Sequence, residues 1–338
     1  MTTTPESSST GAADASTGAA DASTSTGEEE TSSSGGAPAC CNAACSPCGD
    51  LCTSQIVDMA GSGFPEGIAA IDDQVFWASG SFGELRRYDL STGEALLLGT
   101  FDHALTALAV NDEAVFYGSR SSSHPIIGRV DRVSGEATVL SSFDGSLNTG
   151  AGQLVLDDTH LYFSVSDGAE EGNGGVFRLG LVDGVQELVA ATDFAPGVGV
   201  DDDTVYFTDD TNARVKALAK ADIGAGASPT ELALALYPGE LFVGEQYLYY
   251  ASSTGLDRIS KDGGDFTRLL ETTEVVFSIA GDEAHVYAVI PNENRIVRVE
   301  RGTSEPEVVV LPEDGHTIAL TCNSIVWTQG SALLLRPK

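Results

Sequence analysis

A short motif recurs seven times along the chain, and this repetition restricts the fold more than any other feature. The motif is one aliphatic residue followed by two large, mostly aromatic residues. Its copies begin at Val75, Val115, Leu161, Val205, Leu248, Val286 and Ile325. Successive copies start 40, 46, 44, 43, 38 and 39 residues apart. A period near forty with short strands in each unit is typical of a β-propeller, so we expect an all-β fold of seven four-stranded blades.

Each unit has the same internal order. In the fourth unit, an apolar strand at residues 198–200 precedes an acidic turn at 201–203, and the aromatic motif follows. A polar loop, a strand of alternating character and an outermost strand complete the unit. Asp and Asn suit such tight turns because they tolerate left-handed backbone and bond to nearby amides. Since acidic turns recur in most units, we interpret them as structural.

The last unit lacks one strand. Its third strand is expected at residues 332–335, and a strand at 54–59, before the first full unit, can supply the fourth. This exchange would close the ring and leave no exposed sheet edge at the junction. We therefore place the propeller at residues 53–338, with the N-terminal strand closing the last blade.

The first 39 residues contain no Lys, Arg or aromatic residue, and residues 9–15 are repeated unchanged at 16–22. Such a segment buries too little apolar surface to fold, so we expect a disordered acidic spacer. It resembles the Ser/Thr-rich spacers of bacterial surface proteins and lipoproteins. No signal peptide follows Met1, which leaves a cytosolic protein or a start upstream of this one. We favour the second alternative and an extracytoplasmic location, whether secreted, periplasmic or anchored at the outer surface.

Six cysteines follow the spacer or lie near the other end of the chain: Cys40, Cys41, Cys45, Cys48, Cys52 and Cys322. They allow fifteen disulfide pairings, and the odd cluster at residues 40–52 favours one link to Cys322 that would lock the closing blade. Zinc is the alternative, because Cys45 and Cys48 have the Cys-x2-Cys spacing. No second such pair exists, so we favour disulfides and an oxidising compartment.

Charge restricts the partners. Acidic residues outnumber basic ones 50 to 17, a formal charge of −33. Nucleic acid and anionic membranes are poor partners for such a surface, whereas cations and basic ligands are attracted to it. The same charge also serves solubility alone. No apolar run approaches eighteen residues, so we expect no transmembrane segment, and we expect a monomer.

A resemblance to known propellers rests on residues 199–215, GVDDDTVYFTDDTNARV. This stretch resembles the repeats of bacterial extracytoplasmic propellers of the NHL, YVTN and YWTD type, and the likeness extends over residues 53–338. The YWTD tetrad itself is absent, and Tyr206-Phe207-Thr208-Asp209 is the nearest match. The resemblance implies a seven-bladed disc with a central channel and ligand surfaces on its loops. It implies little about activity, because such propellers include binding modules and enzymes.

Polar residues in the loops expected at the channel mouth are the candidate ligand-binding residues. The loop at 164–175 is longer than its counterparts, and function often lies in such loops. The loops leading into the inner strands also carry Glu240. The candidates that we select are Glu66, His103, Asn148, Asp167, Glu170, Asp209, Asp210 and His316.

We expect a non-enzymatic propeller that binds a protein, peptide or glycan, with no cofactor. Calcium is one alternative, with oxygen ligands such as Asp167 and Asp209, although no Asp-x-Asp-x-Asp-Gly loop is present. The other is a metal-dependent lactonase or lyase. The resemblance to propeller lactonases implies a metal in the channel, for which Glu66 and Asn148 are suitable ligands. The matching residues of later blades are absent. No catalytic triad, P-loop or dinucleotide motif is found.

Overall fold

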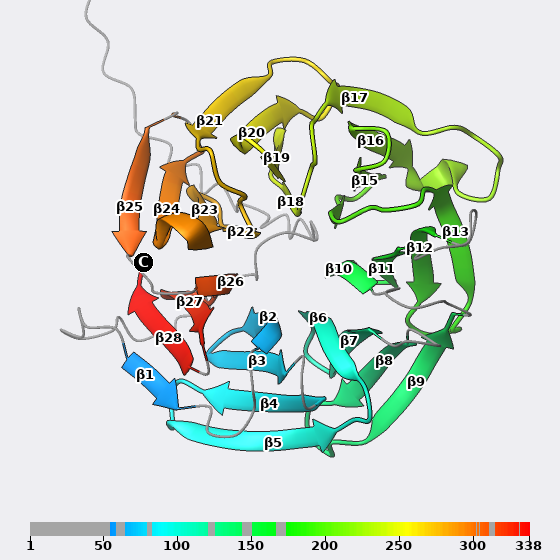
Figure 1. Cartoon of the computed structure of the whole chain (residues 1–338). Coiled ribbons are helices and arrows are strands. Elements are labelled where there is room, and N and C mark those ends of the chain that lie inside the picture. Colours follow the sequence, from blue (N-terminus) through cyan, green and yellow to red (C-terminus); the bar gives the residue numbers. More distant parts are fainter. Residues whose placement is uncertain are drawn as a thin grey trace, which may run out of the picture. The chain divides into compact units, whose positions relative to one another are not determined.

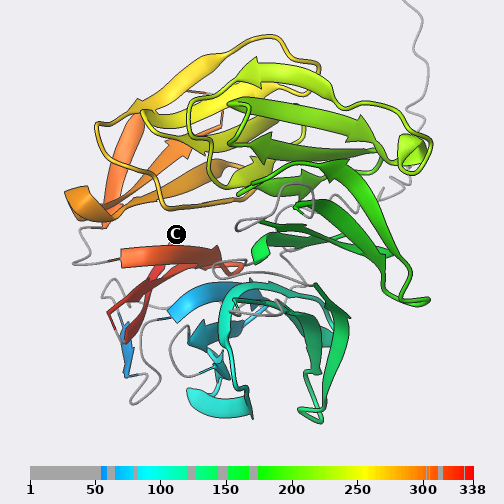
Figure 2. The same cartoon turned by 45° about the vertical axis from the view of Figure 1, so that its right-hand side comes forward.

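The computed structural model describes residues 55–58, 65–79, 83–120, 126–143, 151–166, 174–301, 303, 305–310, 315–330 and 332–338, all within one compact unit. These residues form seven four-stranded antiparallel sheets arranged as blades around a central axis (Figure 1). Turned by 45°, the same view shows the blades as separate sheets that follow one another around the ring (Figure 2). The expected seven-bladed all-β propeller is therefore confirmed.

The strands follow each blade from the axis outward. Blade 1 is β2 (Pro65–Ile71), β3 (Gln74–Ser79), β4 (Glu84–Asp89) and β5 (Glu94–Thr100); blade 2 is β6 (Ala104–Val110), β7 (Ala114–Arg120), β8 (Ile126–Asp131) and β9 (Ala137–Ser142); blade 3 is β10 (Ala151–Leu156), β11 (His160–Val165), β12 (Gly175–Gly180) and β13 (Gln186–Ala191). Blade 4 is β14 (Val198–Val200), β15 (Thr204–Asp209), β16 (Arg214–Ala219) and β17 (Thr230–Leu234); blade 5 is β18 (Leu241–Val243), β19 (Tyr247–Ser252), β20 (Gly255–Ser260) and β21 (Thr267–Glu271). Blade 6 is β22 (Ser278–Gly281), β23 (His285–Ile290), β24 (Arg295–Glu300) and β25 (Pro306–Val310); blade 7 is β26 (Gly315–Leu320), β27 (Ser324–Gln329), β28 (Ala332–Pro337) and β1 (Gln55–Asp58). The helices of the described part are two 3-10 turns, η1 (Lys220–Asp222) and η2 (Pro291–Glu293), and neither is long and apolar enough to cross a membrane.

Ring closure follows the predicted exchange. β1 pairs antiparallel with β28, with Gln55 opposite Leu335 and Asp58 opposite Ala332. The first strand of the chain is thus the outermost strand of the last blade, and β26 packs against β2 to complete the inner ring. Cys322 lies half-buried in the turn between β26 and β27. Its five candidate partners, the spacer and the rest of the cysteine cluster lie outside the described residues, so the disulfides stay a prediction.

The core lies between the blades. Seven clusters of buried apolar side chains each join two neighbouring blades, and the last one joins blade 7 to blade 1. The aromatic motif of the second strands supplies much of this core, because Trp77, Tyr162, Tyr249 and Trp327 are fully buried. Two large side chains in sequence point to opposite faces of a strand, so each motif fills the interface on both sides of its blade.

The acidic turns have the structural role that their recurrence suggested. In blade 4, Asp201 Oδ1 accepts from the amides of Asp203 and Thr204, at 3.2 and 2.9 Å. Its Oδ2 accepts from Lys261 Nζ of blade 5, at 2.7 Å, and from the hydroxyl of Tyr206. Burial alone would raise the pKa of Asp201, but these bonds and the ammonium outweigh it and hold the pKa below its ordinary value. The turn therefore links two blades.

The same link recurs around the ring, always from the residue directly after the third strand of a blade. Lys220 bonds to Asp157 at 2.7 Å, and Lys338 bonds to Asp282 at 2.9 Å. In blade 2 this position is Arg132, which bonds to Gln74 of blade 1. We did not foresee this pattern, because the partners are about sixty residues apart and a single Lys or Arg after a strand carries no distinctive signal.

Candidate functional site

A cavity of about 890 Å³ lies where the inner strands converge. All seven blades line it, through the starts of β2, β6, β10 and β26 and the loops that lead into β14, β18 and β22. These segments occupy the face of the ring where ligand surfaces were expected. Ligand pockets are concave sites that combine apolar surface with a few placed polar groups, and this wall contains both, so we take this cavity as the candidate site.

Gln153 of β10 fixes one part of the wall. Its Nε2 donates to the carbonyl of Leu241 at 2.9 Å, and its Oε1 accepts from the amides of Val198 and Leu241, both at 3.1 Å. One side chain therefore joins the inner strands of blades 3, 4 and 5. Because its amide bonds in three places, Gln153 is a rigid wall element rather than a group waiting for a ligand.

Glu240 holds the corresponding place in blade 5. Its Oε2 accepts from the amide of Ile279 in blade 6 at 2.8 Å, and the hydroxyl of Ser278 also bonds to the carboxyl group. The side chain lies deep in the ring, and what remains exposed belongs to the cavity wall. Burial raises the pKa of Glu240 to about 7, despite the two hydrogen bonds that favour the ionised form. The cavity thus holds a carboxyl group that changes charge near neutral pH.

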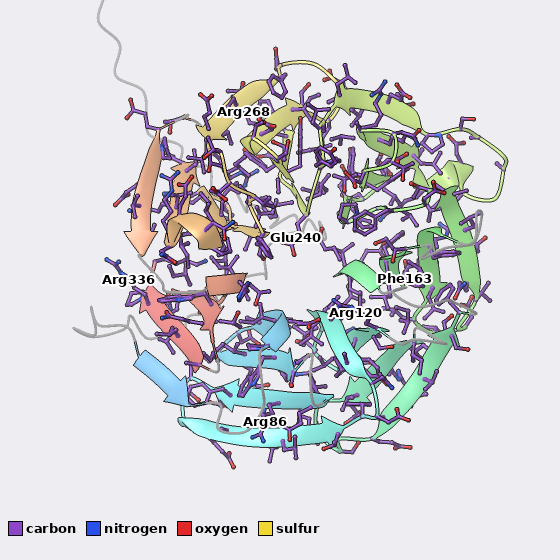
Figure 3. All side chains as sticks on the ribbon, viewed as in Figure 1. Arg86, Arg120, Phe163, Glu240, Arg268 and Arg336 are labelled. Atoms are coloured by element: carbon purple, nitrogen blue, oxygen red, sulfur yellow. The ribbon has the colours of Figure 1, made fainter. Side chains whose placement is uncertain are left out.

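A carboxylate is not required for this inter-blade bond. In blade 6, Ser278 occupies the equivalent position, and its Oγ accepts from the amide of Ile318 of blade 7 at 3.4 Å. Gln153 does the same in blade 3 without any charge. The fold therefore does not require an ionisable group at this position, where Glu240 lies near the axis of the ring (Figure 3).

On blades 1 and 2 the wall carries an ion pair. Arg120 Nη2, at the end of β7, donates to Glu66 Oε2 in β2 at 3.1 Å. Arg120 is the one Lys or Arg among the described lining residues. In Figure 3, Arg120 and Glu240 lie close to the axis, whereas Arg86, Arg268 and Arg336 lie farther out. Glu66 is therefore neutralised by Arg120, while Glu240 has no cationic partner among the described residues.

Apolar side chains dominate the opposite part of the wall. Phe194 lies in the loop before β14, and Val275 and Phe277 lie in the loop before β22; all three are exposed although large and apolar. The ring of His316, in β26, meets the ring of Phe277 edge-on, with centroids 5.8 Å apart. The cavity wall therefore combines exposed aromatic side chains with the half-buried carboxyl group of Glu240.

The predicted site residues fall into three groups. Glu66 and His316 line the cavity, as expected for the channel mouth. His103 instead packs against the rings of Phe101 and Tyr117, bonds to Asp102 through Nδ1 at 2.7 Å and does not line the cavity with His316. Asn148, Asp167 and Glu170 lie outside the described residues, as do most of the long loop that carries two of them.

Asp209 and Asp210 are not part of the cavity wall. Asp209 is fully buried and bonds to Lys216 Nζ at 2.6 Å and to Asn212 Nδ2 at 2.9 Å. Burial opposes ionisation, but these partners hold the pKa of Asp209 below its ordinary value. Burial and the nearby Asp209 raise the pKa of Asp210. Within the described part of the chain, no three His, Cys, Asp or Glu side chains are grouped as metal ligands.

The sequence analysis did not select Gln153, Phe194 or Phe277 as candidate ligand-binding residues. It placed Glu240 in a loop at the channel mouth but did not include it among the candidates. A signal was present for Gln153, because a polar residue interrupts an apolar inner strand at that point. The character of Glu240 depends on Ile279 and Ser278 of the next blade, about forty residues away. Contacts of that kind are set by the ring and not by the local sequence.

Comparison with known proteins supports the fold alone. No family model matches the sequence, and no curated protein is significantly similar to it. Among solved structures, U3-55K is similar with a TM-score of 0.66 and 10% identity, covering 87% of this chain and 100% of that one. A chain of the Mitotic Checkpoint Complex has a TM-score of 0.65 and 11% identity, covering 84% and 93%.

A third similar structure is PorZ, a bacterial surface component of the type-IX secretion system of Porphyromonas gingivalis. Its TM-score is 0.63 at 15% identity, and the match covers 83% of this chain and 37% of that one. At such identities the likeness shows a propeller fold and nothing about ligands. The NHL, YVTN or YWTD type stays a prediction.

Proposed function

We propose that this chain is an extracytoplasmic, non-enzymatic binding propeller of the NHL/YVTN/YWTD type, secreted or displayed at a bacterial surface, and that it holds its ligand at the axial cavity. The observation that carries the proposal is the cavity wall itself, which combines exposed Phe194 and Phe277 with the half-buried Glu240. In a ligand pocket the apolar surface supplies affinity, and the few polar groups fix the orientation of the bound ligand. The acidic Ser/Thr-rich spacer and the cysteine cluster support the location.

The hydrolase alternative has less support, because the lining carboxylate expected to hold a metal is paired with a guanidinium. The Glu66–Arg120 bond would have to break before Glu66 could serve as a metal ligand. The ionisable Glu240 could act as a base, but proton transfer alone does not distinguish an enzyme from a binding protein. Both functions place the ligand in one cavity, so one set of variants tests both.

The test measures binding of the full-length protein to arrays of peptides and glycans from a bacterial envelope, alongside hydrolysis of lactones with and without added calcium. Phe277→Ala removes an aromatic face from the cavity, and Phe266→Ala removes an equally exposed phenylalanine outside it. A ligand that is lost in Phe277→Ala and kept in Phe266→Ala supports the proposal. Equal retention by both variants contradicts the assigned site. Calcium-dependent lactone turnover that Glu66→Gln abolishes would establish the hydrolase instead.

A further inference from the structure

The exposed apolar residues of the ligand face gather on one side of the ring. Three consecutive loops, which lead into β14, β18 and β22, expose five large apolar side chains. These five, which we name the apolar rim, are Phe194, Leu236, Tyr237, Val275 and Phe277. Most other exposed large apolar residues of the described part lie on the outermost strands and the turns before them. Phe194, Val275 and Phe277 also line the cavity, whereas Leu236 and Tyr237 lie in the same set of loops outside its wall. Apolar residues gathered in neighbouring loops mark an interaction site, whereas scattered residues do not.

Tyr237 adds a second observation. The residue is 72% exposed, and its backbone has a φ of 45°, in the left-handed region that bulky residues avoid. The loop is nevertheless held, because the Ser253 amide donates to the Leu236 carbonyl at 3.2 Å and the Gly239 amide donates to the Ala251 carbonyl at 2.9 Å. A fixed, strained loop that presents an aromatic ring to solvent is typical of a functional surface.

The ionisable groups beside the apolar rim are carboxyl groups, whose negative form a bound cation would favour. Glu240 lines the cavity three residues after Tyr237 in the same loop, while Arg120, on the other side, is paired with Glu66. Asp210 donates its backbone amide to the Phe194 carbonyl at 3.1 Å, and its buried Oδ1 has no hydrogen-bond partner among the described residues. The rim thus combines aromatic faces with carboxyl groups that lack cations.

At two other places in the ring, a lysine lies beside both a carboxylate and an aromatic ring. Lys261 Nζ bonds to Asp201 and lies 5.8 Å from the centre of the Tyr206 ring. Lys220 Nζ bonds to Asp157 and lies 5.3 Å from the centre of the Tyr162 ring. In both places a cation satisfies a carboxylate and an aromatic face together. At Glu240 and Phe277 the described residues provide the acid and the ring but no cation.

We propose that the apolar rim and Glu240 bind a peptide segment of a partner protein, with a Lys or Arg side chain entering the cavity and apolar residues on either side of it. This inference rests on the proposed function. The chain's own spacer is unsuited, because residues 1–39 contain no Lys, Arg or aromatic residue. Anionic lipids and nucleic acids are repelled by a protein of charge −33. The partner's basic side chain matches the carboxyl group, and its apolar neighbours match the rim.

The test uses fluorescence anisotropy with the full-length protein and a labelled nonapeptide whose centre is Leu-Phe-Lys-Phe-Leu. One matched peptide replaces the lysine by norleucine, and another replaces the apolar neighbours by serine. We expect each matched peptide to bind at least about tenfold more weakly than the first, since each loses either the charge-assisted bond or the apolar burial. Binding of the lysine peptide should also weaken as salt is added.

Protein variants locate the interaction. Glu240→Gln keeps an oxygen acceptor for the Ile279 amide but removes the charge, so the preference for lysine over norleucine should disappear. Phe277→Ala should weaken all three peptides, and Phe266→Ala should bind as wild type does. Circular dichroism melts establish that each variant is folded.

Equal binding of the lysine and norleucine peptides by the wild-type protein, or an unchanged preference in Glu240→Gln, overturns the inference. Failure of the lysine peptide, combined with an envelope ligand that depends on Phe277, overturns the inference and leaves the proposed function standing. Binding of the lysine peptide that is the same in Phe277→Ala and Phe266→Ala overturns both.

Discussion

Replacing Glu240 by glutamine should change how the stability of the protein depends on pH. The carboxyl group of Glu240 has a pKa of about 7 in the folded chain, compared with an ordinary value of 4.5, and burial is the main cause. Below pH 4.5 the group is protonated in both states. Between pH 4.5 and about 7 the unfolded chain releases the proton while the folded chain retains it. Folding therefore becomes less favourable as pH rises through this window, and the effect levels off above it.

The size of the effect follows from the same difference. One pKa unit is worth ~1.4 kcal/mol, so the interval from 4.5 to about 7 corresponds to roughly 3 kcal/mol of unfolding free energy. Glutamine has nearly the same shape and can still accept from the Ile279 amide, but it does not titrate. Relative to wild type, Glu240→Gln should therefore gain roughly 3 kcal/mol between pH 4 and pH 8.

Urea unfolding at several pH values measures this gain, with fluorescence of the two tryptophans as the signal. Trp77 and Trp327 are both buried, so unfolding exposes them to water. Glu231→Gln, on the exposed outer strand β17, controls for the loss of one negative charge. A stability difference between Glu240→Gln and wild type that stays constant within ~0.5 kcal/mol from pH 4 to pH 8 would refute the reasoning.

Three further predictions concern the ring. Lys261→Met should lower the unfolding free energy by ~1–3 kcal/mol, because it leaves the partly buried Asp201 without its ammonium partner. Glu231→Gln, which breaks an exposed ion pair, should cost under ~1 kcal/mol. Urea unfolding at pH 7 compares the two variants, and equal losses would contradict a stabilising link between blades 4 and 5. Asp201→Asn should reduce the loss of stability in acid. The pKa of Asp201 is lowered in the folded chain, so its carboxylate contributes stability above the ordinary pKa of 3.8, and this contribution disappears as pH falls through the folded-state pKa. Melting curves from pH 5 to pH 2 measure the change, and the same loss of stability in the variant as in wild type would count against the prediction. Gly255→Ala should lower the unfolding free energy by more than ~3 kcal/mol, because φ is 146° and a Cβ would overlap the Leu270 carbonyl oxygen. Gly184→Ala, which has open space around it, should cost ~1 kcal/mol in the same urea assay. Similar losses in the two variants would contradict the steric argument.

The period and the closure of the ring could be predicted from the sequence because both depend on local patterns. Each aromatic motif must lie in a strand buried on both faces, as Trp77 and Tyr162 are, and the spacing of the motifs counts the blades directly. The incomplete last unit then required a strand from elsewhere, and the apolar stretch before the first unit was available. β1 pairs with β28 as that reasoning demanded.

The candidate site was less accessible to the same reasoning. Of the candidates expected at the channel mouth, Glu66 and His316 do line the cavity. However, local sequence does not show which side chain from one blade meets which backbone amide of the next. Asp209 looked like a ligand residue because it is acidic and lies beside a loop, yet Lys216 and Asn212 satisfy it within its own blade.

In a repeating fold, a feature that recurs in several blades is explained by the architecture, whereas a feature found in one blade needs another explanation. The links between acidic turns and the cations of the next blade recur at Asp157, Asp201 and Asp282, so the ring itself accounts for them. The acid of Glu240 is different, because Gln153 makes the same inter-blade bond without a charge. The strained, exposed Tyr237 is likewise not required to close a blade. Features that the architecture does not demand thus gather on blades 4 to 6, and this is why the proposed ligand is placed on that side of the cavity.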